Sequence, residues 1–273
     1  MAAISILMSL YIKEKPEFTR ECFDSLLKQT VKADEWVIVE DGPLSVEMYS
    51  LLNEYQRKYP GLIKRIPIKE NQGLGLALHA GIPECKNEII ARMDTDDISR
   101  KDRFEKQLHE FQTNPQLDIC GSHIIEFEET PEHELSRRKV PLDHRAIVAY
   151  QKTRSAFNHM TVMYKKSAVL KAGNYEDCPL MEDDMLWVRM IQSGARCSNI
   201  DDYLVYARTG TAMIERRGGW DYFRKYRDGK KKIKATGYIN EVDYIKAIIP
   251  QLIVSLIPRK LRLWVFTRML RKE

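Results

Sequence analysis

The sequence lacks the features that mark disordered, repetitive or disulfide-stabilised chains. It contains no low-complexity tract and no internal repeat, which argues against disorder and against a solenoid. Its five cysteines include no close pair, so neither a zinc site nor a disulfide framework is indicated. We expect reduced cysteines in an ordinary globular core, because 273 residues suffice for one α/β core with an appended segment.

A secretory leader and a long apolar run are also missing. Residues 2–12 are apolar, but no basic segment precedes them and no small-residue cleavage site follows. Near the C-terminus, the uncharged run from Ala247 to Pro258 is shorter than the roughly 20 residues that a membrane-spanning helix needs. These observations predict a cytoplasmic location.

Positive charge is concentrated in the C-terminal part of the chain. From Arg216 to Glu273 there are 16 Lys and Arg against 5 Asp and Glu, although the whole chain carries a net charge of only +5. An amphipathic helix is predicted in the same region. One stripe of this helix holds Ile248, Ile249, Leu252, Ile253, Leu256 and Ile257, and the opposite stripe holds Gln251, Ser255, Arg259 and Arg262. Together with Trp264, this pattern favours an anionic membrane surface over nucleic acid. A helix packed on the protein's own core with a solvated basic face is the alternative.

Apolar runs separated by turn signals predict an α/β fold in the first hundred residues. Strands are expected at Ile4 to Tyr11, Trp36 to Val39, Ile63 to Ile68 and Glu88 to Met93, and helices at Phe18 to Leu27, Val46 to Tyr59 and Leu76 to Gly81. This alternation predicts a Rossmann-like, mainly parallel sheet with helices on both faces.

The second half is expected to continue the same domain with mixed topology. Strands are expected at Leu117 to Gly121 and Thr161 to Tyr164, a strand or a hairpin near Ile124 to Phe127, and helices at Arg103 to Phe111 and Met185 to Ser193. The polar stretch from Glu128 to Arg138 is predicted to be a mobile loop.

Three aspartates follow directly on a predicted strand. Asp94, Asp96 and Asp97 crowd several carboxylates at one point, and such a cluster needs a cation. Oxygen-only ligands suit Mg²⁺ or Mn²⁺, which also bind the phosphates of a nucleotide. An acidic helix cap is the alternative.

Two further segments are candidates for binding a nucleotide. Asp41 ends the second strand, where it could accept a hydrogen bond from a base, although Asp-Gly-Pro also forms ordinary turns. The loop that contains Asn71, Gly73 and Gly75 could let the backbone approach a phosphate or a ribose, with a plain turn as the alternative. Ligands of parallel sheets bind at the carboxyl ends of the strands, where Asp41 and Asp94 are both expected.

Acidic residues also begin the predicted helix that contains Met185. Glu182, Asp183 and Asp184 are explained by helix capping, or one of them could accept a proton in a reaction; Asp183 is the candidate. His159 lies next to a predicted strand, and it is either a pocket residue or a core histidine.

Taken in order, these segments resemble family 2 of the nucleotide-sugar glycosyltransferases, in particular bacterial enzymes that build capsule and O-antigen repeat units. The matching stretches are Ser5 to Tyr11, Ser25 to Thr30, Val37 to Gly42, Asn71 to Leu78, Met93 to Ile98, His159 to Tyr164 and Glu182 to Asp183. The likeness covers about residues 3–210. Two positions depart from the family pattern: Glu40-Asp41-Gly42-Pro43 replaces Asp-Asp-Gly-Ser, and Asp184 replaces an aromatic residue.

The resemblance implies a GT-A fold and an inverting transfer that gives a β-linked product from an α-linked donor. It implies that Tyr11, Glu14 and Asp41 surround the nucleoside and that Asp94 and Asp96 bind the metal and the diphosphate. Asp183 would be the general base. The catalytic domain is then 1–211, with a nucleotide-binding half (1–100) and an acceptor-binding half (101–211), followed by a basic helical tail (212–273).

The predicted activity is metal-dependent transfer of a hexose or N-acetylhexosamine from a UDP-sugar to a lipid-linked saccharide at the inner face of the plasma membrane. His159, Glu182 and Asp97 are expected to line the donor and acceptor pocket, Asn71 and Gly73 the nucleotide site, and the acceptor lipid is expected to be undecaprenyl diphosphate. Two alternatives remain open. A sugar-phosphate nucleotidyltransferase would need a Gly-rich loop after the first strand, and a non-catalytic membrane scaffold would not depend on Asp183.

Overall fold

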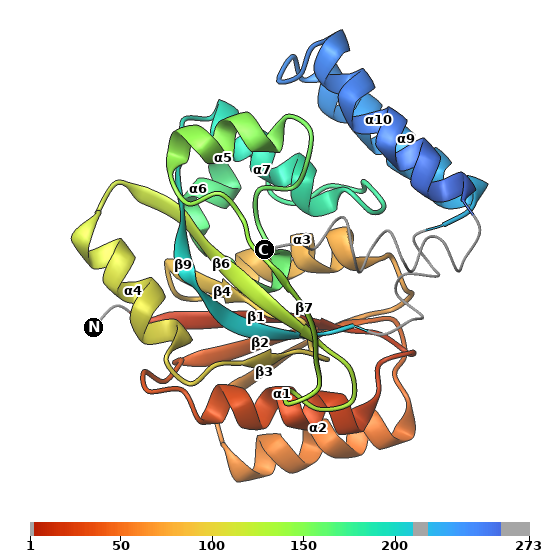
Figure 1. The fold of residues 1–273 in the computed structure, drawn as a ribbon. Helices are drawn as coiled ribbons and strands as arrows, with labels where there is room; N and C mark the ends of the chain where they lie inside the picture. The colour runs from red at the N-terminus through yellow and green to blue at the C-terminus, as the bar shows by residue number, and fades with distance from the viewer. Residues whose placement is uncertain (1–2, 210–217, 258–273) are drawn as a thin grey trace.

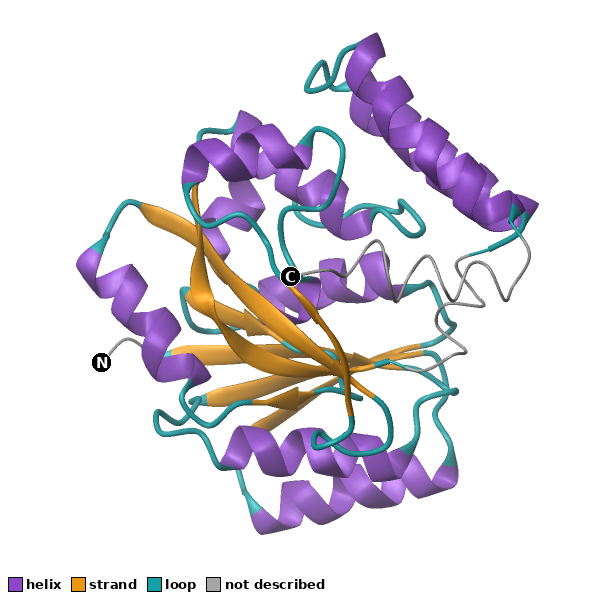
Figure 2. Ribbon diagram, in the orientation of Figure 1, coloured by secondary structure: helices purple, strands orange, loops and turns teal. Residues whose placement is uncertain are grey.

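The computed structural model describes residues 3–209 and 218–257, which form a helix-covered mixed sheet with two further helices beside it (Figures 1 and 2). Eight strands follow one another across the sheet in the order β3-β2-β1-β4-β8-β6-β9-β5, and β7 pairs with β6. The sheet therefore runs without interruption through both predicted halves of the catalytic domain.

The first half of the sheet is parallel, as predicted. Its strands are β1 (Ile4–Leu10), β2 (Glu35–Asp41), β3 (Ile63–Ile68) and β4 (Ile89–Arg92), joined by α1 (Pro16–Leu27), α2 (Val46–Lys58) and α3 (Leu74–Glu84). Side chains alternate between the faces of each strand, so Ile4, Ile6 and Met8 pack toward α1 and α2, whereas Leu7 packs toward α3. Burial on both faces explains why β1, β2 and β4 are mostly apolar, whereas β3 is half-exposed and carries basic side chains.

The second half is mixed, also as predicted, but it contains elements that the sequence did not reveal. Its strands are β5 (Ile98–Ser99), β6 (Leu117–Phe127), β7 (Glu134–Arg138), β8 (Met163–Lys165) and β9 (Arg196–Arg208). Its helices are α4 (Arg103–Thr113), α5 (His144–Gln151), α6 (Lys166–Lys171), α7 (Glu182–Gln192) and the 3₁₀ turn η1 (His159–Thr161). Strand β8 is antiparallel to both neighbours, whereas β9 is parallel to β6. All five cysteines are buried and free, as expected.

The prediction of a mobile loop from Glu128 to Arg138 is wrong for residues 134–138. Residues 134–138 form β7, which pairs antiparallel with β6, and the two predicted strands at residues 117–121 and 124–127 are one strand. Strand β7 is exposed or half-buried along its length, so its residues carry no apolar alternation. Edge strands of this kind are held by backbone pairing, which the sequence pattern does not show.

Two helices form an antiparallel pair at the C-terminal end, α9 (Trp220–Ala235) and α10 (Glu241–Leu256). A capping box formed by Asn240 and Asp243 begins α10. Ile233 of α9 and Ile239 pack against Met181 and Met185, so the pair rests on the start of α7. The predicted tail residues Arg259, Arg262 and Trp264 lie outside the described residues.

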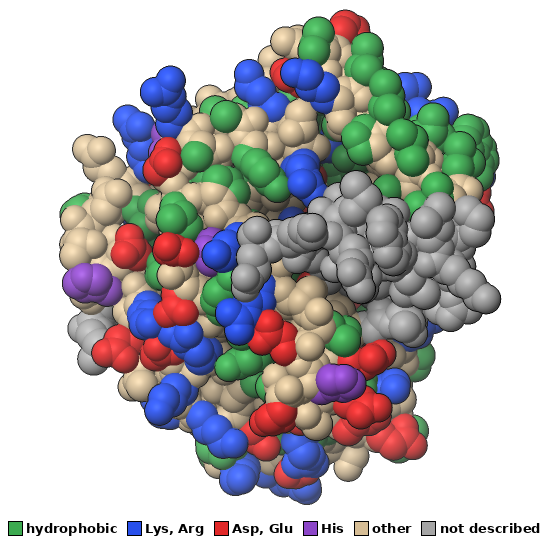
Figure 3. Space-filling view, viewed as in Figure 1, with side chains coloured by type: hydrophobic (Ala, Val, Ile, Leu, Met, Phe, Trp, Pro, Cys, Tyr) green, Lys and Arg blue, Asp and Glu red, His purple; other side chains and the backbone are tan. Residues whose placement is uncertain are grey.

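The outward face of α10 is apolar. Its exposed large hydrophobic side chains are Val242, Ile245, Ile249, Ile253 and Leu256, and the exposed Lys246 also belongs to this helix. Hydrophobic side chains gather along the C-terminal helices in Figure 3. The two described residues of the expected polar stripe are not on the exposed face: Ser255 is buried, and the half-buried Gln251 donates a hydrogen bond to its hydroxyl (3.2 Å). No helix among the described residues is long and apolar enough to span a membrane.

Candidate active site

The predicted site residues of the first half lie at the carboxyl edge of the parallel strands. Asp41 is the last residue of β2, and Asp94 lies two residues beyond the end of β4. The parallel register pairs Leu10 with Glu40 and Leu7 with Arg92, which brings these strand ends together. Tyr11 and Glu14 lie in the turn after β1, closed by a hydrogen bond from the Glu14 amide to the Tyr11 carbonyl (3.0 Å).

The carboxylates of Asp94, Asp96 and Asp97 converge, with one oxygen of each within 4.8 Å of the others. Burial and the Asp94 charge raise the pKa of Asp96 to about 6, and burial together with Asp96 raises the pKa of Asp97 well above its usual range. Asp97 Oδ1 accepts the Arg208 backbone amide (2.7 Å), whereas its buried Oδ2 has no hydrogen-bond partner. A divalent cation would satisfy this oxygen and relieve the repulsion.

Asp41 organises the predicted nucleotide loop. Its carboxylate accepts the Asn71 amide group (2.9 Å) and the backbone amides of Gln72 (2.7 Å) and Gly73 (3.0 Å). At the neighbouring Gly42, φ is +85° and an added Cβ would lie 2.8 Å from the Asn71 nitrogen, so this turn requires glycine. The Asp41 carboxylate therefore holds loop 71–73 against the end of β2.

The loop also touches the predicted acceptor side. An added Cβ at Gly75 would lie 2.7 Å from the Glu176 carbonyl oxygen and 2.9 Å from the Glu182 Cβ, so only glycine permits this approach of α3 to α7. A cavity of about 230 Å³ lies between them, with residues 72–76 on one wall and residues 177–180 and Glu182 on the other. The predicted nucleotide loop and the acidic start of α7 thus face one cavity.

Arg92 connects the two sets of acids electrostatically. Its guanidinium is buried and pairs with the Asp94 carboxylate at 2.5 Å. The same positive charge acts on Glu182 and Asp183, and the Asp94 charge acts on Glu182. Residues 94 and 182–183, some 90 positions apart in the sequence, therefore converge on one site.

Asp183 has the environment of a proton acceptor that works near neutral pH. Burial, followed by the charges of Asp184 and Glu182, raises its pKa to about 8. The pKa of Glu182 is also raised by burial. Asp183 Oδ1 accepts the Asp184 backbone amide (2.8 Å), so both capping and a catalytic role are compatible with this position.

Asp184 has a structural environment that the sequence did not reveal. Gln151 of α5 donates a hydrogen bond to its carboxylate (2.7 Å), and the fully buried Lys230 of α9 lies 3.6 Å from the other oxygen. Asp184 therefore joins α7 to α5 and to the C-terminal helix pair. Its replacement of the family's aromatic residue is explained by this buried ion pair.

His159 lies among aromatic side chains behind the acids. Its Nε2 pairs with the Tyr175 hydroxyl at 2.9 Å, and its ring packs against Trp187. Burial, followed by the Arg92 charge, lowers the pKa of His159 well below its usual value. The side chain is accordingly a neutral hydrogen-bonding group at the back of the site.

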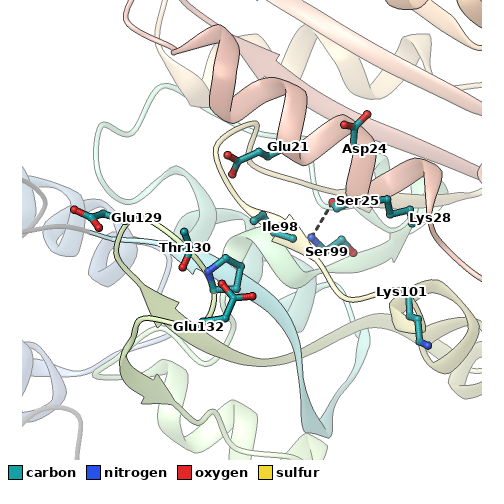
Figure 4. Close-up of a pocket in the computed structure, with 11 residues that line it drawn as sticks. Glu21, Asp24, Ser25, Lys28, Ile98, Ser99, Lys101, Glu129, Thr130 and Glu132 are labelled. Carbon is teal, nitrogen blue, oxygen red and sulfur yellow. Dashed lines mark hydrogen bonds between the residues drawn. The ribbon is translucent and has the colours of Figure 1, made fainter.

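Another cavity, of about 440 Å³, lies elsewhere, between α1, β5 and the turn at 129–132 (Figure 4). Glu21, Asp24, Lys28 and Lys101 give it a mixed charge, and it contains none of the predicted site residues. It therefore has no arrangement that suits a specific chemistry.

Comparison with known proteins decides the family. The model of "Glycosyl transferase family 2" matches residues 5–170. This chain belongs to glycosyltransferase family 2.

Relatives and solved structures agree with this assignment. The chain is 39% identical to the amylovoran biosynthesis glycosyltransferase AmsE of Erwinia amylovora, over 88% of this chain and 90% of that protein. It is 34% identical to the UDP-Gal:alpha-D-GlcNAc-diphosphoundecaprenol beta-1,3-galactosyltransferase of Escherichia coli, over 98% and 96%. The fold resembles S. aureus TarS 1–349 in complex with UDP-GlcNAc, with a TM-score of 0.65, 16% identity, and coverage of 92% and 71%. The predicted GT-A fold is confirmed, and the protein is a glycosyltransferase.

Sequence reasoning missed two arginines of this family 2 site. Arg92 lies inside an apolar strand directly before the aspartates, and that position was the available signal. No local sequence pattern indicates a role for Arg208, which is the last residue of β9. Its Nε donates to the Asp96 carbonyl oxygen (3.0 Å), and its guanidinium lies 4.0 Å from the Phe18 ring centroid. Arg208 thus fixes the backbone of the aspartate cluster from a strand more than a hundred residues away.

Proposed function

We propose that this glycosyltransferase transfers a hexose or N-acetylhexosamine, with inversion, from a UDP-sugar to a lipid-linked saccharide in bacterial surface polysaccharide synthesis. The observation that carries the proposal is the position of the buried Arg92. It pairs with Asp94 of the aspartate cluster, which suits a cation, and its charge also acts on Asp183, which suits a proton. The printed name of the E. coli relative, which combines UDP-Gal with a diphosphoundecaprenol acceptor, supports the same chemistry.

Asp94 and Asp96 would hold Mn²⁺ or Mg²⁺, with Asp97 beside them. The three converging carboxylates and the unpartnered buried oxygen of Asp97 fit such a cation. When bound, it neutralises the charge that develops on the leaving diphosphate. Arg92 fixes the Asp94 carboxylate, and Arg208 fixes the backbone of Asp96.

Asp183 acts as the general base. The acceptor hydroxyl attacks the anomeric carbon on the face opposite the diphosphate, the bond from that carbon to the diphosphate oxygen breaks, and the hydroxyl proton passes to the Asp183 carboxylate. Tyr11, Glu14 and Asp41 form the nucleoside end of the site, with loop 71–73 beside them. Glu182 and His159 complete the wall of the sugar pocket.

The exposed apolar face of α10 would lie in the interface of the inner leaflet of the plasma membrane. Val242, Ile245, Ile249, Ile253 and Leu256 form this face along nearly the full length of the helix. A monomeric soluble protein rarely exposes a continuous apolar stripe. The basic surplus of the C-terminal part suits an anionic leaflet, where a lipid-linked acceptor resides.

The test uses the full-length protein, Mn²⁺ and a panel of nucleotide sugars, and it measures donor binding and nucleotide release. We expect one UDP-sugar to bind and to be turned over. Asp183→Asn should retain donor affinity and lose turnover by about 10²-fold or more. Asp228→Asn, which changes an exposed acid of α9 that does not line this cavity, is the matched control. Absence of binding by every nucleotide sugar, or full activity of Asp183→Asn, contradicts the proposal.

A further inference from the structure

A second groove, of about 340 Å³, lies between α10 and the segment that follows α5. Its apolar wall is formed by Ala247, Pro250 and Val254 of α10, and Tyr226 of α9 adds an aromatic ring. Two cationic residues, Arg154 and Lys246, line the same groove. The groove thus combines an apolar surface with positive charge.

Among the described residues that line this groove, none carries a carboxylate. The Arg154 guanidinium lies 6.0 Å from the Tyr150 ring centroid, so a cation–π contact restricts its position. Two cations without a neighbouring acid favour a ligand with at least two negative charges. The apolar wall favours a hydrocarbon chain attached to that charge.

The groove lies on the acceptor side of the catalytic site. Tyr226 connects the groove to α7. Its ring centroid is 5.8 Å from the Lys230 ammonium, and that ammonium is 3.6 Å from the carboxylate of Asp184, which follows the proposed general base in the sequence. The charges of Asp184 and Arg154 both act on the Tyr226 hydroxyl. A ligand in the groove would therefore lie behind the helix that carries Asp183.

Helix α10 presents different faces to the groove and to the outside. Residues 247, 250, 251 and 254 line the groove, whereas residues 242, 245, 249, 253 and 256 form the exposed apolar stripe on the other side of the helix. A hydrocarbon chain leaving the groove would have this stripe close by.

We propose that this groove binds the diphosphate and the first isoprene units of a polyprenyl-diphosphate-linked acceptor. Arg154 and Lys246 neutralise the diphosphate, and Ala247, Pro250 and Val254 contact the prenyl chain. The inference rests on the proposed function, because it assigns a place to that acceptor. It also explains why α9 and α10 are joined to α7: the helices that hold the lipid are fixed to the helix that holds the base.

Binding of farnesyl diphosphate tests the proposal without turnover. The full-length protein is first saturated with UDP and Mn²⁺, so that the nucleotide site is occupied, and binding is then followed by calorimetry. We expect farnesyl diphosphate to bind at least about tenfold more tightly than farnesol or inorganic diphosphate. Equal binding of inorganic diphosphate would show a phosphate site only, equal binding of farnesol would show a non-specific apolar surface, and either result overturns the proposal.

Variants locate the binding. The pair Arg154→Ala/Lys246→Ala should weaken farnesyl diphosphate binding about tenfold or more, and Gln251→Glu, which adds a carboxylate to the groove wall, should weaken it in the same direction. Lys225→Ala/Lys231→Ala is the control, because it removes the same charge from exposed positions of α9 outside the groove. Equal affinities of the groove variants and the control pair would overturn the proposal.

The two proposals fail separately. Farnesyl diphosphate binding needs neither a donor sugar nor catalysis, so it remains measurable if no UDP-sugar is turned over. If sugar transfer to a lipid acceptor succeeds while the groove variants bind farnesyl diphosphate normally, only the groove assignment falls.

Discussion

At the scale of single residues, the site is built from carboxylates that the fold places in unfavourable surroundings. Asp96, Asp97 and Asp183 all have raised pKa values because burial disfavours their charged forms. Such clusters lower the free energy of unfolding, and they are found at sites that bind a cation or transfer a proton. The buried Arg92 offsets part of this cost for both acidic sets.

Asp183 should give the reaction an ascending pH dependence. A general base works only when ionised, so kcat/KM should rise as pH increases through about 8 in the free enzyme. Saturation with the cation should move this limb to lower pH, because added positive charge favours the carboxylate. A pH profile from 5.5 to 9.5 checks both statements, and a flat profile would contradict the role of Asp183.

The same pKa predicts a stability effect of the opposite sign. Because the folded-state pKa of Asp183 is raised above its unfolded value, the stability it contributes is complete at low pH and is lost as pH rises through about 8. Asp183→Asn should therefore melt at a higher temperature than the wild type at pH 8.5, with a smaller difference at pH 5. Thermal unfolding at the two pH values measures this.

The positions of candidate site residues could be predicted from the sequence only where neighbours along the chain reveal them. Asp94, Asp96 and Asp183 follow or begin predicted elements, so their convergence could be expected from the ends of strands and helices. Arg208 and Lys230 act across the fold through contacts with Asp96 and Asp184. No local pattern distinguishes them from other basic residues, so only the tertiary structure reveals these contacts.

At the scale of elements, the approach of α3 to α7 depends on one missing side chain. Gly75→Ala would place a methyl group against the Glu176 carbonyl oxygen and Glu182 Cβ, both rigid parts of the opposite wall. We expect a loss of stability of about 1–3 kcal/mol and weaker UDP-sugar binding. Denaturant unfolding and donor titration measure the two effects. Wild-type values in both would show that the two walls separate easily.

The ion pair between α7 and α9 should show coupling in a double-mutant cycle. Lys230→Met leaves the Asp184 charge buried without its partner, so it should destabilise the protein by about 3 kcal/mol. Adding Asp184→Asn removes that charge but keeps an acceptor for Gln151, and should restore much of the loss. Urea unfolding of all four proteins gives the coupling, and simple additivity would contradict it.

Helices and strands differ in how well their sequences reveal them. Strands β1, β2 and β4 are buried and mostly apolar, whereas β3 is half-exposed and contains two basic residues; all four were predicted to within a few residues. Strand β7 was missed, and helix α9 was expected only as an undivided part of a helical tail, because their stability comes from partners, β6 in one case and α7 with α10 in the other. Their own residues are largely polar and mark no buried face.

At the scale of the whole molecule, the apolar face of α10 predicts membrane association. Ile249→Glu/Ile253→Glu should reduce sedimentation with vesicles that contain anionic lipid, because both side chains are exposed in the middle of the stripe. Turnover of a soluble acceptor should be unchanged. The control, Val46→Glu, introduces a charge at an exposed apolar position of α2, away from this face. Equal sedimentation of both variants and the wild type would exclude this face as the docking surface.

The continuous sheet has a consequence for how such an enzyme diversifies. Strands of residues 1–100 and of residues 101–209 belong to one hydrogen-bonded sheet through β4, β8 and β6, so these two parts cannot rotate apart as separate domains. A change of acceptor specificity is therefore expected to arise outside the sheet. The helix pair α9 and α10 is such a place, because it is joined to the sheet domain through a few side chains such as Lys230. Related enzymes could replace this helix pair during evolution and keep the donor-binding strands unchanged.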